Sequence, residues 1–296
     1  MSPSRREPSN LAASVHARLL RLAKQSNQNF NVVLVRFASE RILYRLSRSA
    51  HADSFVLKGA WLFYVWDMQR RVTRDVDLLG FGNASISVIE DVFREVLSSE
   101  VEPDGIEFDI AGLNVAEIRK AAAYPGLRVR VVARLGTARI ACQVDVGFGD
   151  AVVDRPVKTQ LPTLLDLPAP ELCVYPVEAV IAEKIEAMVR LGALNSRLKD
   201  YFDLYVLATE LTIDGASLSR QFAETFQRRG TLIPADEPVG LSREFASERE
   251  RAARWGAFLH RSGATAGVPG DFREVVEKIR ALVLTPLEAA RGDGGS

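Results

Sequence analysis

Cysteine and histidine are scarce in this chain of 296 residues, which contains two cysteines and three histidines. Cys142 and Cys173 lie in apolar stretches and show no metal-ligand spacing, so neither a zinc site nor a disulfide framework is expected. The histidines are scattered along the chain. These features predict a protein of a reducing compartment, with the cytoplasm as its expected location.

Long apolar runs are also missing. No run approaches the roughly 20 residues that a membrane-spanning helix needs, and the first residues, "MSPSRREPSNLAAS", lack the apolar core of a signal peptide. The composition, 47% hydrophobic and 26% charged, is typical of a soluble globular protein. We therefore expect no membrane partner, and a length comfortable for two domains.

Net charge is absent overall, but the charges are unevenly distributed. Residues 1–50 contain nine Lys/Arg and two Glu, a net of +7, whereas residues 75–110 contain ten Asp/Glu and one Arg, a net of −9. The basic segment would suit a polyanion-binding surface beside an acidic metal site. Alternatively, the two segments neutralise one another in the folded protein, and the sequence leaves both interpretations open.

Apolar periodicity predicts mixed strands and helices first, followed by helices. Helices are expected at residues 10–26, 31–49, 85–98, 176–191, 197–210, 215–228, 241–260 and 271–283, with Ser85 or Ser87 as an N-cap. Strands are expected in "SFVLK", "DVDLLGF", "IEFDIAGLNV", "LRVRVVARL" and "ARIACQVDVGF". Five prolines within 154–176 predict a connection between two parts. The prediction is an α+β core, residues 1–172, and a C-terminal helical domain, residues 173–296.

Asp75 and Asp77 are the most informative polar residues, because they begin an apolar strand. Residues i and i+2 of a strand point to the same face, so these two carboxylates lie side by side. Like charges repel unless a cation lies between them, and Mg²⁺ prefers one or two carboxylates together with phosphate oxygens. The alternative is a strand end whose aspartates simply face water.

Two further features support a site for a phosphorylated ligand. Lys58-Gly59-Ala60 lies at a predicted strand-to-helix turn, where glycine lets the backbone approach a phosphate. Asp145 lies in another apolar strand, within "QVDVGFGD". A third carboxylate from a neighbouring strand would complete a triad that holds a metal and activates a hydroxyl nucleophile.

Four blocks, in order, resemble a known family: "FVLKGAWLFYVW", "TRDVDLLGFG", "VDVGFGD" and "YPVEAVIAEKIEAMVRLGALNSRLKDYFDLYVL". The first two resemble the Gly-Ser and D-x-D motif of the polymerase-β-like nucleotidyltransferases, with Ala60 in place of the usual serine. Together they resemble the AbiEii-type toxins of toxin–antitoxin systems, a group that includes the MenT enzymes. The resemblance covers roughly residues 30–210 and implies a nucleotidyltransferase core built on a small mixed β-sheet, with N-terminal helices and a C-terminal helical bundle.

The resemblance also implies roles for individual residues. Asp75, Asp77 and Asp145 would hold Mg²⁺, and Asp145 would also accept the proton of the acceptor hydroxyl. The nucleotide would be bound by Lys58, Gly59, Ala60, Lys184, Arg197, Lys199 and Asp200. Either Asp203 or Asp200 would orient Lys184. Without the resemblance, Lys184 would be an ordinary lysine at the edge of an apolar stripe, and Lys199–Asp203 a surface salt bridge.

The activity implied is transfer of a nucleoside monophosphate from a nucleoside triphosphate to a hydroxyl, with tRNA 3′ ends as the expected acceptor. Arg128, Arg130 and Arg134 on one strand would suit an RNA backbone. A neighbouring gene would encode the cognate antitoxin. Alternatives are a protein or small-molecule acceptor, a D-x-D glycosyltransferase or nuclease, and a binding module without activity.

Thr73, two residues before Asp75, is a candidate for regulatory modification. A phosphate on this residue would add negative charge beside the metal carboxylates and repel the incoming triphosphate. The alternative is a threonine that merely shapes the turn before the strand.

Overall fold

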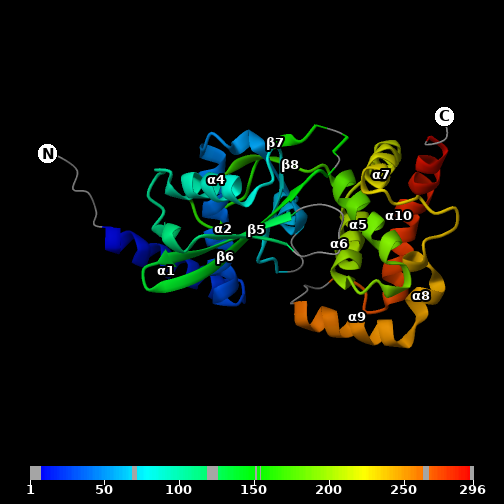
Figure 1. Ribbon diagram of the computed structural model, residues 1–296. Coiled ribbons are helices and arrows are strands. Elements are labelled where there is room, and N and C mark those ends of the chain that lie inside the picture. Colours follow the sequence, from blue (N-terminus) through cyan, green and yellow to red (C-terminus); the bar gives the residue numbers. More distant parts are fainter. Residues whose placement is uncertain are drawn as a thin grey trace. The chain divides into compact units, whose positions relative to one another are not determined.

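The computed structural model describes residues 8–68, 72–118, 126–150, 152–153, 155–262 and 267–293. The described residues form two compact units (Figure 1). The first, here called the sheet unit, comprises residues within Met1–Val65, Thr73–Gly149 and Val157–Val174. The second, the helical unit, comprises residues within Trp66–Val72, Asp150–Pro156 and Tyr175–Ser296. No helix in the described ranges is long and apolar enough to cross a membrane.

The sheet unit is built around a mixed β-sheet. Its strands are β1 (Phe55–Lys58), β2 (Val76–Gly80), β3 (Ile106–Phe108), β4 (Asn114–Glu117), β5 (Gly126–Leu135), β6 (Ala138–Phe148), β7 (Val157–Gln160) and β8 (Glu171–Val174). The strand order is β3-β5-β6-β2-β1-β8-β7, and β4 also pairs with β5. The β2–β6 and β1–β8 pairs are parallel and the others antiparallel. The predicted α+β fold with a mixed sheet is confirmed.

Four α-helices belong to the sheet unit: α1 (Pro8–Gln25), α2 (Phe30–Arg48), α3 (Leu62–Val65) and α4 (Ile86–Ser98). Two of them begin at polar caps. The side chain of Asn29 accepts a hydrogen bond from the N–H of Asn31, and the hydroxyl of Ser85 accepts one from the N–H of Val88. Each cap satisfies a backbone donor that the first turn of a helix leaves unpaired. Ser85, one of the two N-caps expected for α4, is the residue that caps it.

One face of the sheet is apolar and buried. Leu57, Leu78, Val146 and Leu127 are paired in a row across β1, β2, β6 and β5, and each is at most 2% exposed. On α4, Phe93 packs against Phe55 of β1, with ring centroids 6.0 Å apart. Because side chains alternate along each strand, the residues next to this apolar row project from the opposite face.

Two sequence-based predictions in the sheet unit were wrong in detail. The segment expected as a linker, 154–176, contains β7 and β8, which pair with each other at one edge of the sheet. Its prolines lie outside these short strands, where they remove no ladder hydrogen bond. The strand expected from "IEFDIAGLNV" is divided into β3 and β4, because Asp109 accepts a hydrogen bond from the N–H of Gly112 and closes a turn of 3₁₀-helix.

The helical unit contains α5 (Val177–Leu191), α6 (Leu198–Glu210), α7 (Gly215–Arg229), α8 (Arg243–Ser247), α9 (Arg249–Ser262) and α10 (Phe272–Asp293). The single helix expected over 241–260 is two helices, because Glu248 adopts an extended conformation between α8 and α9. The helix α10 continues past Pro286 to Asp293, beyond the end expected from the sequence. Residues 294–296 lie outside the described range.

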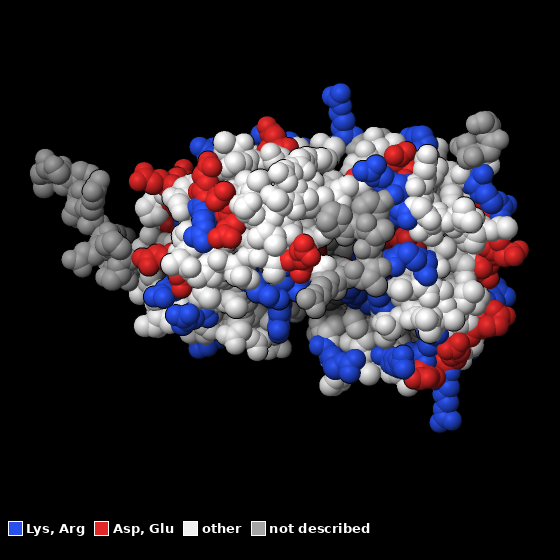
Figure 2. Space-filling model, in the orientation of Figure 1, with Lys and Arg blue, Asp and Glu red and all other residues white. Residues whose placement is uncertain are grey.

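The basic N-terminal segment is partly neutralised inside the sheet unit. Arg45 of α2 makes a buried ion pair with Asp104, with Nη1 and Oδ2 2.7 Å apart, and Arg41 pairs with Glu40. Blue and red side chains are interspersed over the surface drawn in Figure 2. At Arg41 and Arg45 the acidic residues therefore neutralise the basic ones, and neither arginine is available to a polyanion. Arg5 and Arg6 lie outside the described residues.

Candidate active site

Four charged residues form one row across the middle of the sheet. Lys58 is the cross-strand partner of Asp77, Asp77 is the partner of Asp145, and Asp145 is the partner of Arg128. Directly paired residues project from the same face, so the charges run in the order positive, negative, negative, positive. The structure therefore brings together two of the three predicted metal carboxylates and one predicted nucleotide-binding lysine.

Asp77 explains why residue 59 is a glycine. Gly59 has a φ of +70°, and a Cβ built on it would lie 2.2 Å from Oδ2 of Asp77. The carboxylate of Asp77 thus occupies the space where a side chain of residue 59 would lie. Asp75, two residues earlier, precedes β2 and is exposed to solvent, whereas Asp77 is half-buried. Ala60 follows in the short 3₁₀ turn Gly59–Trp61.

Asp145 is held by Arg128 in a two-point ion pair. Nε of Arg128 donates to Oδ1 at 2.8 Å, and Nη2 donates to Oδ2 at 2.7 Å. Asp145 is only 8% exposed, so this fork fixes a nearly buried carboxylate. The hydrogen bonds to Asp145 raise the pKa of Arg128, and the charges of Asp145, Asp75 and Asp77 raise it further, against the effect of burial. Arg128 is therefore electrostatically coupled to all three carboxylates.

The three predicted metal ligands are not arranged as a triad. No group of three or more His, Cys, Asp or Glu residues able to hold a metal ion is found in the described residues. Asp77 lies over Gly59, and both oxygens of Asp145 are engaged by Arg128. Asp75 and Asp77 still fit Mg²⁺, because this ion needs only one or two protein carboxylates when water and substrate phosphates complete its shell.

A second charged cluster lies inside the helical unit. Nζ of Lys184, on α5, donates to Oδ1 of Asp200 at 3.0 Å and to Oδ2 of Asp203 at 2.8 Å, both on α6. The two aspartates are three residues apart and share one face of α6, where each is 1% exposed. The sequence left open which aspartate would orient Lys184, and in this structure both contact it.

The remaining predicted nucleotide-binding residues lie at the start of α6. Arg197 precedes the helix, and its Nε donates a short hydrogen bond to Asp200. Lys199, one residue into the helix, is exposed. Arg197 is also largely exposed, whereas the side chain of Lys184 is 14% exposed. The cluster therefore presents cations at a surface above two buried carboxylates.

A match to a family profile identifies the family of this chain. The profile of the family described as "Nucleotidyl transferase AbiEii toxin, Type IV TA system" matches residues 41–278, a range that contains both charged clusters. The chain belongs to the AbiEii toxin family. It is therefore a nucleotidyltransferase of a toxin–antitoxin family, which confirms the resemblance and the enzyme class expected from the sequence.

Other comparisons are weaker. A "putative nucleotidyltransferase from H. pylori" is 13% identical, with a TM-score of 0.47 over 90% of this chain and 98% of its own. A second structure, "JHP933 from Helicobacter pylori", is 13% identical, with a TM-score of 0.46 over 89% and 94% of the two chains. No curated protein matches the sequence.

Thr73, the candidate for regulatory modification in this AbiEii chain, does not lie on a strand. It precedes β2 in a loop, is half-buried, and its hydroxyl donates to the carbonyl oxygen of Asp75 at 3.4 Å. The hydroxyl is thus next to the backbone of a predicted metal ligand, which is consistent with a residue that shapes the turn.

One network of ion pairs was not predicted from the sequence. Arg229 at the end of α7 contacts Asp150, Glu183 and Glu186 at 2.8, 3.3 and 2.9 Å, respectively. Burial alone would lower the pKa of Arg229, but these carboxylates outweigh it and raise the pKa. Through Arg229, Asp150 is therefore linked to α5 and α7 of the helical unit. No periodicity indicated these contacts, because the partners of Arg229 lie 43 to 79 residues from it along the chain.

Replacing Gly59 by alanine is expected to disturb Asp77 directly. The new methyl group would displace the Asp77 carboxylate, and the backbone would keep a φ that alanine adopts only with strain. We expect the free energy of unfolding to fall by about 1–3 kcal/mol and nucleotide transfer to fall at least tenfold. Chemical denaturation and a transfer assay measure the two effects. The matched control is Gly136→Ala, which also has a positive φ but nothing within 4 Å of the added Cβ. Equal losses of activity in both variants would contradict the specific role of Gly59.

The decrease in the free energy of unfolding at acidic pH should depend on Asp200. Burial raises the pKa of Asp200, but the charges of Lys184 and Arg197 outweigh burial and lower it from 3.8 to about 2. A lowered folded-state pKa means that the stabilisation is complete above the unfolded pKa and is lost as the pH falls from about 4 to about 2. The shift corresponds to roughly 2 kcal/mol. Urea unfolding at several pH values should therefore give a shallower acid decline for Asp200→Asn than for the unchanged chain, and identical slopes would contradict the assignment.

Proposed function

We propose that the chain transfers a nucleoside monophosphate from a nucleoside triphosphate to an acceptor hydroxyl, and that the acceptor is the 3′ end of tRNA. The observation that carries this proposal is the row Lys58–Asp77–Asp145–Arg128, next to Asp75, in a chain of the AbiEii family. In this row, the two carboxylates that are proposed to serve the metal and the proton lie on one face of the sheet. Catalysis of phosphoryl chemistry needs such positioning more than it needs covalent participation.

Asp75 and Asp77 are proposed to hold Mg²⁺, because one is exposed and the other lies in the space that Gly59 leaves. When bound, the ion would neutralise the triphosphate and polarise the phosphorus that is attacked. Lys58 and the backbone around Gly59 and Ala60 would bind phosphate oxygens on the β1 side of the row. The hydroxyl contact that serine would supply at residue 60 is missing.

Asp145 is proposed to accept the proton of the acceptor hydroxyl. That oxygen then forms a bond to the α-phosphorus, and the bond to pyrophosphate breaks. Each carboxylate oxygen has more than one acceptor site, so Asp145 can take a proton while Arg128 holds it in place. Arg128 thus acts as a positioning residue for the base.

Lys184, Arg197 and Lys199 are proposed to supply positive charge to the triphosphate. Lys184 is fixed between Asp200 and Asp203, so its ammonium group is held in one place before substrate binds. A preorganised cation costs little reorganisation when charge develops on the phosphates.

Addition of a nucleotide to tRNA would block aminoacylation and thereby stop translation and growth. Membership of a Type IV toxin–antitoxin family implies a cognate antitoxin, and we propose that a neighbouring gene encodes it. Expression of the chain alone should then arrest growth, and co-expression with the neighbouring gene should restore it. Growth arrest that persists with every adjacent gene would contradict this arrangement.

Thr73 is proposed as a site at which the antitoxin acts by phosphorylation. Its hydroxyl donates to the carbonyl oxygen of Asp75, so a phosphate would place negative charge beside the proposed site of the triphosphate. Mass spectrometry of the protein made with and without the neighbouring gene tests this proposal. An unmodified Thr73 in neutralised cells would contradict it and leave binding of the antitoxin or control of the transcript.

The acceptor is tested with each of the four nucleoside triphosphates labelled at the α-phosphate, together with Mg²⁺, total RNA and a cell lysate depleted of RNA. We expect the label to migrate with tRNA on a denaturing gel. Label in the protein fraction or in a small molecule would support the alternative acceptors. Pyrophosphate formation distinguishes this reaction from that of a D-x-D glycosyltransferase or nuclease.

A further inference from the structure

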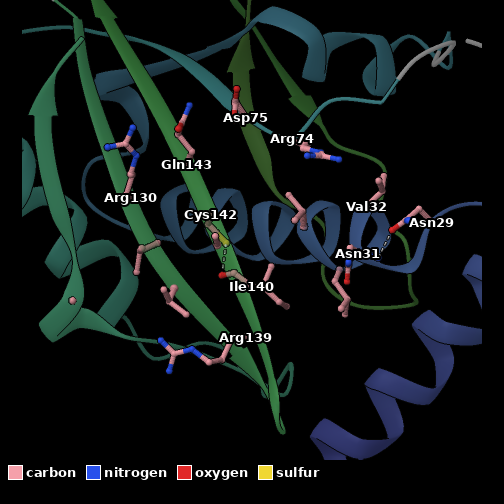
Figure 3. Close-up of a pocket in the computed structure, with 16 residues that line it drawn as sticks. Asn29, Asn31, Val32, Arg74, Asp75, Arg130, Arg139, Ile140, Cys142 and Gln143 are labelled. Carbon is pink, nitrogen blue, oxygen red and sulfur yellow. Dashed lines mark hydrogen bonds between the residues drawn. The ribbon is translucent and has the colours of Figure 1, made fainter. Parts of the chain in front are cut away.

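A cavity of about 720 Å³ lies in the sheet unit and reaches the predicted metal site. It is bounded by the start of α2, the middle of β5 and the first half of β6, and Asp75 forms part of its wall (Figure 3). Its charged lining consists of Arg74, Arg130, Arg139 and Asp75. Three cations and one carboxylate therefore give this cavity an excess of positive charge.

The cavity lies where β6 has a free edge. The first pair between β2 and β6 joins Val76 to Val144, whereas the pairing of β5 with β6 extends back to Ala138. In the described part of the chain, residues 138–143 of β6 therefore pair with a strand on one side only. This gap in the sheet, beside the first turn of α2, makes room for a ligand next to Asp75.

In the described part of the chain, none of the three arginines of the cavity forms an ion pair with a carboxylate. Within the described ranges, neither a hydrogen bond nor an ion pair joins Arg74, Arg130 or Arg139 to another side chain. Other arginines on β5 differ, because Arg128 is bound by Asp145 and Arg134 lies 3.7 Å from Asp109. Unpaired guanidinium groups in a concave site favour an anionic ligand, and their planar fork matches phosphate oxygens.

The arginines are spread along a track. Arg130 is the cross-strand partner of Gln143, and Arg139 lies four residues before Gln143 on the same strand. Four strand residues correspond to roughly 13 Å. Figure 3 shows Arg130, Gln143 and Asp75 near one end of the cavity and Arg139 at the other. Cations at this separation suit a chain with repeated phosphates better than a single phosphate group.

The track leads to the proposed catalytic base. Gln143 and Asp145 are two residues apart on β6, so they project from the same face, as do their partners Arg130 and Arg128. The triphosphate is proposed to bind at the other end of the row, beside Lys58 and Gly59. The β5–β6 end is thus left for the acceptor.

We propose that this cavity binds the phosphate backbone of the acceptor's 3′-terminal single-stranded segment and directs its 3′-hydroxyl to Asp145. The inference rests on the proposed nucleotidyl transfer and adds an acceptor site, with Arg130 and Arg139 as phosphate-binding residues. The side-chain amides of Asn31 and Gln143, which also line the cavity, can hydrogen-bond to base edges.

The test uses the full chain with Arg130→Ala, with Arg139→Ala, and with both. Binding of a fluorescein-labelled single-stranded RNA of about ten nucleotides is followed by anisotropy over a range of salt concentrations, without nucleoside triphosphate. Each phosphate contact on a single strand contributes about 0.7 to the slope of log K against log salt. We expect each substitution to weaken binding on the order of tenfold and to reduce the slope by about 0.7.

The matched control is Arg48→Ala. Arg48 is an exposed arginine at the C-terminal end of α2, about 25 Å along the helix from the cavity residue Asn31. Its loss removes the same charge and should leave the salt dependence unchanged. In the transfer assay, the two cavity variants should raise the KM for RNA and leave the KM for the triphosphate unchanged.

The outcomes separate this proposal from the proposed function. One outcome is that the unchanged chain labels RNA while the cavity variants bind RNA and transfer nucleotide as well as the unchanged chain does. In that case the proposed acceptor site is wrong, but the proposed nucleotidyl transfer is retained. If the label enters protein only, and the variants do not alter that transfer, the RNA acceptor and the cavity assignment both fail. If no acceptor is labelled while RNA binding still depends on Arg130 and Arg139, the proposed function fails and the cavity is an RNA-binding site.

Discussion

Asp77→Asn is expected to abolish nucleotide transfer, with a loss on the order of a thousandfold or more, while the chain stays folded. Asparagine keeps the shape of the side chain above Gly59 but removes the charge that would hold Mg²⁺ against the triphosphate. The same loss is expected for Asp75→Asn. Repulsion among Asp75, Asp77 and Asp145 is relieved in both variants, so the free energy of unfolding should stay equal or rise slightly.

The measurement is incorporation of α-labelled nucleotide by each purified variant at saturating Mg²⁺. Asp53→Asn is the matched control, because Asp53 is an exposed carboxylate of the sheet unit outside the charged row. Near-normal activity of Asp75→Asn or Asp77→Asn would show that the metal assignment is wrong. A loss of activity accompanied by unfolding would leave the chemistry unexplained.

Lys184→Ala should reduce transfer by two to three orders of magnitude, because it removes a fixed, largely buried cation that is proposed to bind the triphosphate. Lys184→Arg should not restore full activity, since a planar fork replaces a compact point charge between Asp200 and Asp203. Removal of the ammonium group also leaves the buried carboxylates of Asp200 and Asp203 without the cation between them, so their negative charges repel each other. A loss of about 3 kcal/mol in the free energy of unfolding is therefore expected as well.

Kinetics must separate these two effects. Transfer is measured well below the unfolding midpoint, with circular dichroism confirming the fold at the assay temperature. Lys278→Ala, which removes an exposed lysine from α10, controls for the loss of one positive charge from the helical unit. Full activity of a folded Lys184→Ala variant would show that Lys184 has only a structural role, as the ion-pair partner of Asp200 and Asp203.

Local rules predicted most of the helices, because apolar periodicity and polar caps act over one or two turns. Asn29 and Ser85 are such caps, and α2, α4, α5 and α6 lie within two residues of their expected bounds. The helices after residue 240 were predicted less well. The extended conformation of Glu248 and the passage of α10 through Pro286 depend on packing within the helical unit rather than on local propensity.

The charged row shows which part of the site was accessible from the sequence. Period-two alternation predicts that Asp75 and Asp77 share a face, but Asp75 precedes β2 and is not part of the row. This alternation does not predict that Asp77 lies opposite Asp145, because that register comes from parallel pairing of strands separated by about 60 residues. Arg128 illustrates the same limit, since its role as the partner of Asp145 appears only when β5 and β6 are aligned.

Gly59 and the proline-rich segment show how a local signal can have another cause. Glycine at residue 59 predicts a close approach of phosphate, and the structure adds a second reason for glycine, because the Asp77 carboxylate excludes a side chain there. The prolines within 154–176 suggested a linker, whereas they flank two short strands that complete the edge of the sheet. In both cases the deciding contact joins residues distant in sequence.

Transfer of the α-phosphate of a nucleoside triphosphate to an RNA 3′-hydroxyl is the activity proposed for this AbiEii chain. The most direct measurement compares α- and γ-labelled triphosphate with tRNA whose 3′ end is either intact or destroyed by periodate oxidation. The account predicts that α-label enters only intact tRNA, that γ-label is recovered as pyrophosphate in equal amount, and that Asp77→Asn does neither. Transfer of γ-label to the acceptor, or equal labelling of oxidised tRNA, would contradict it.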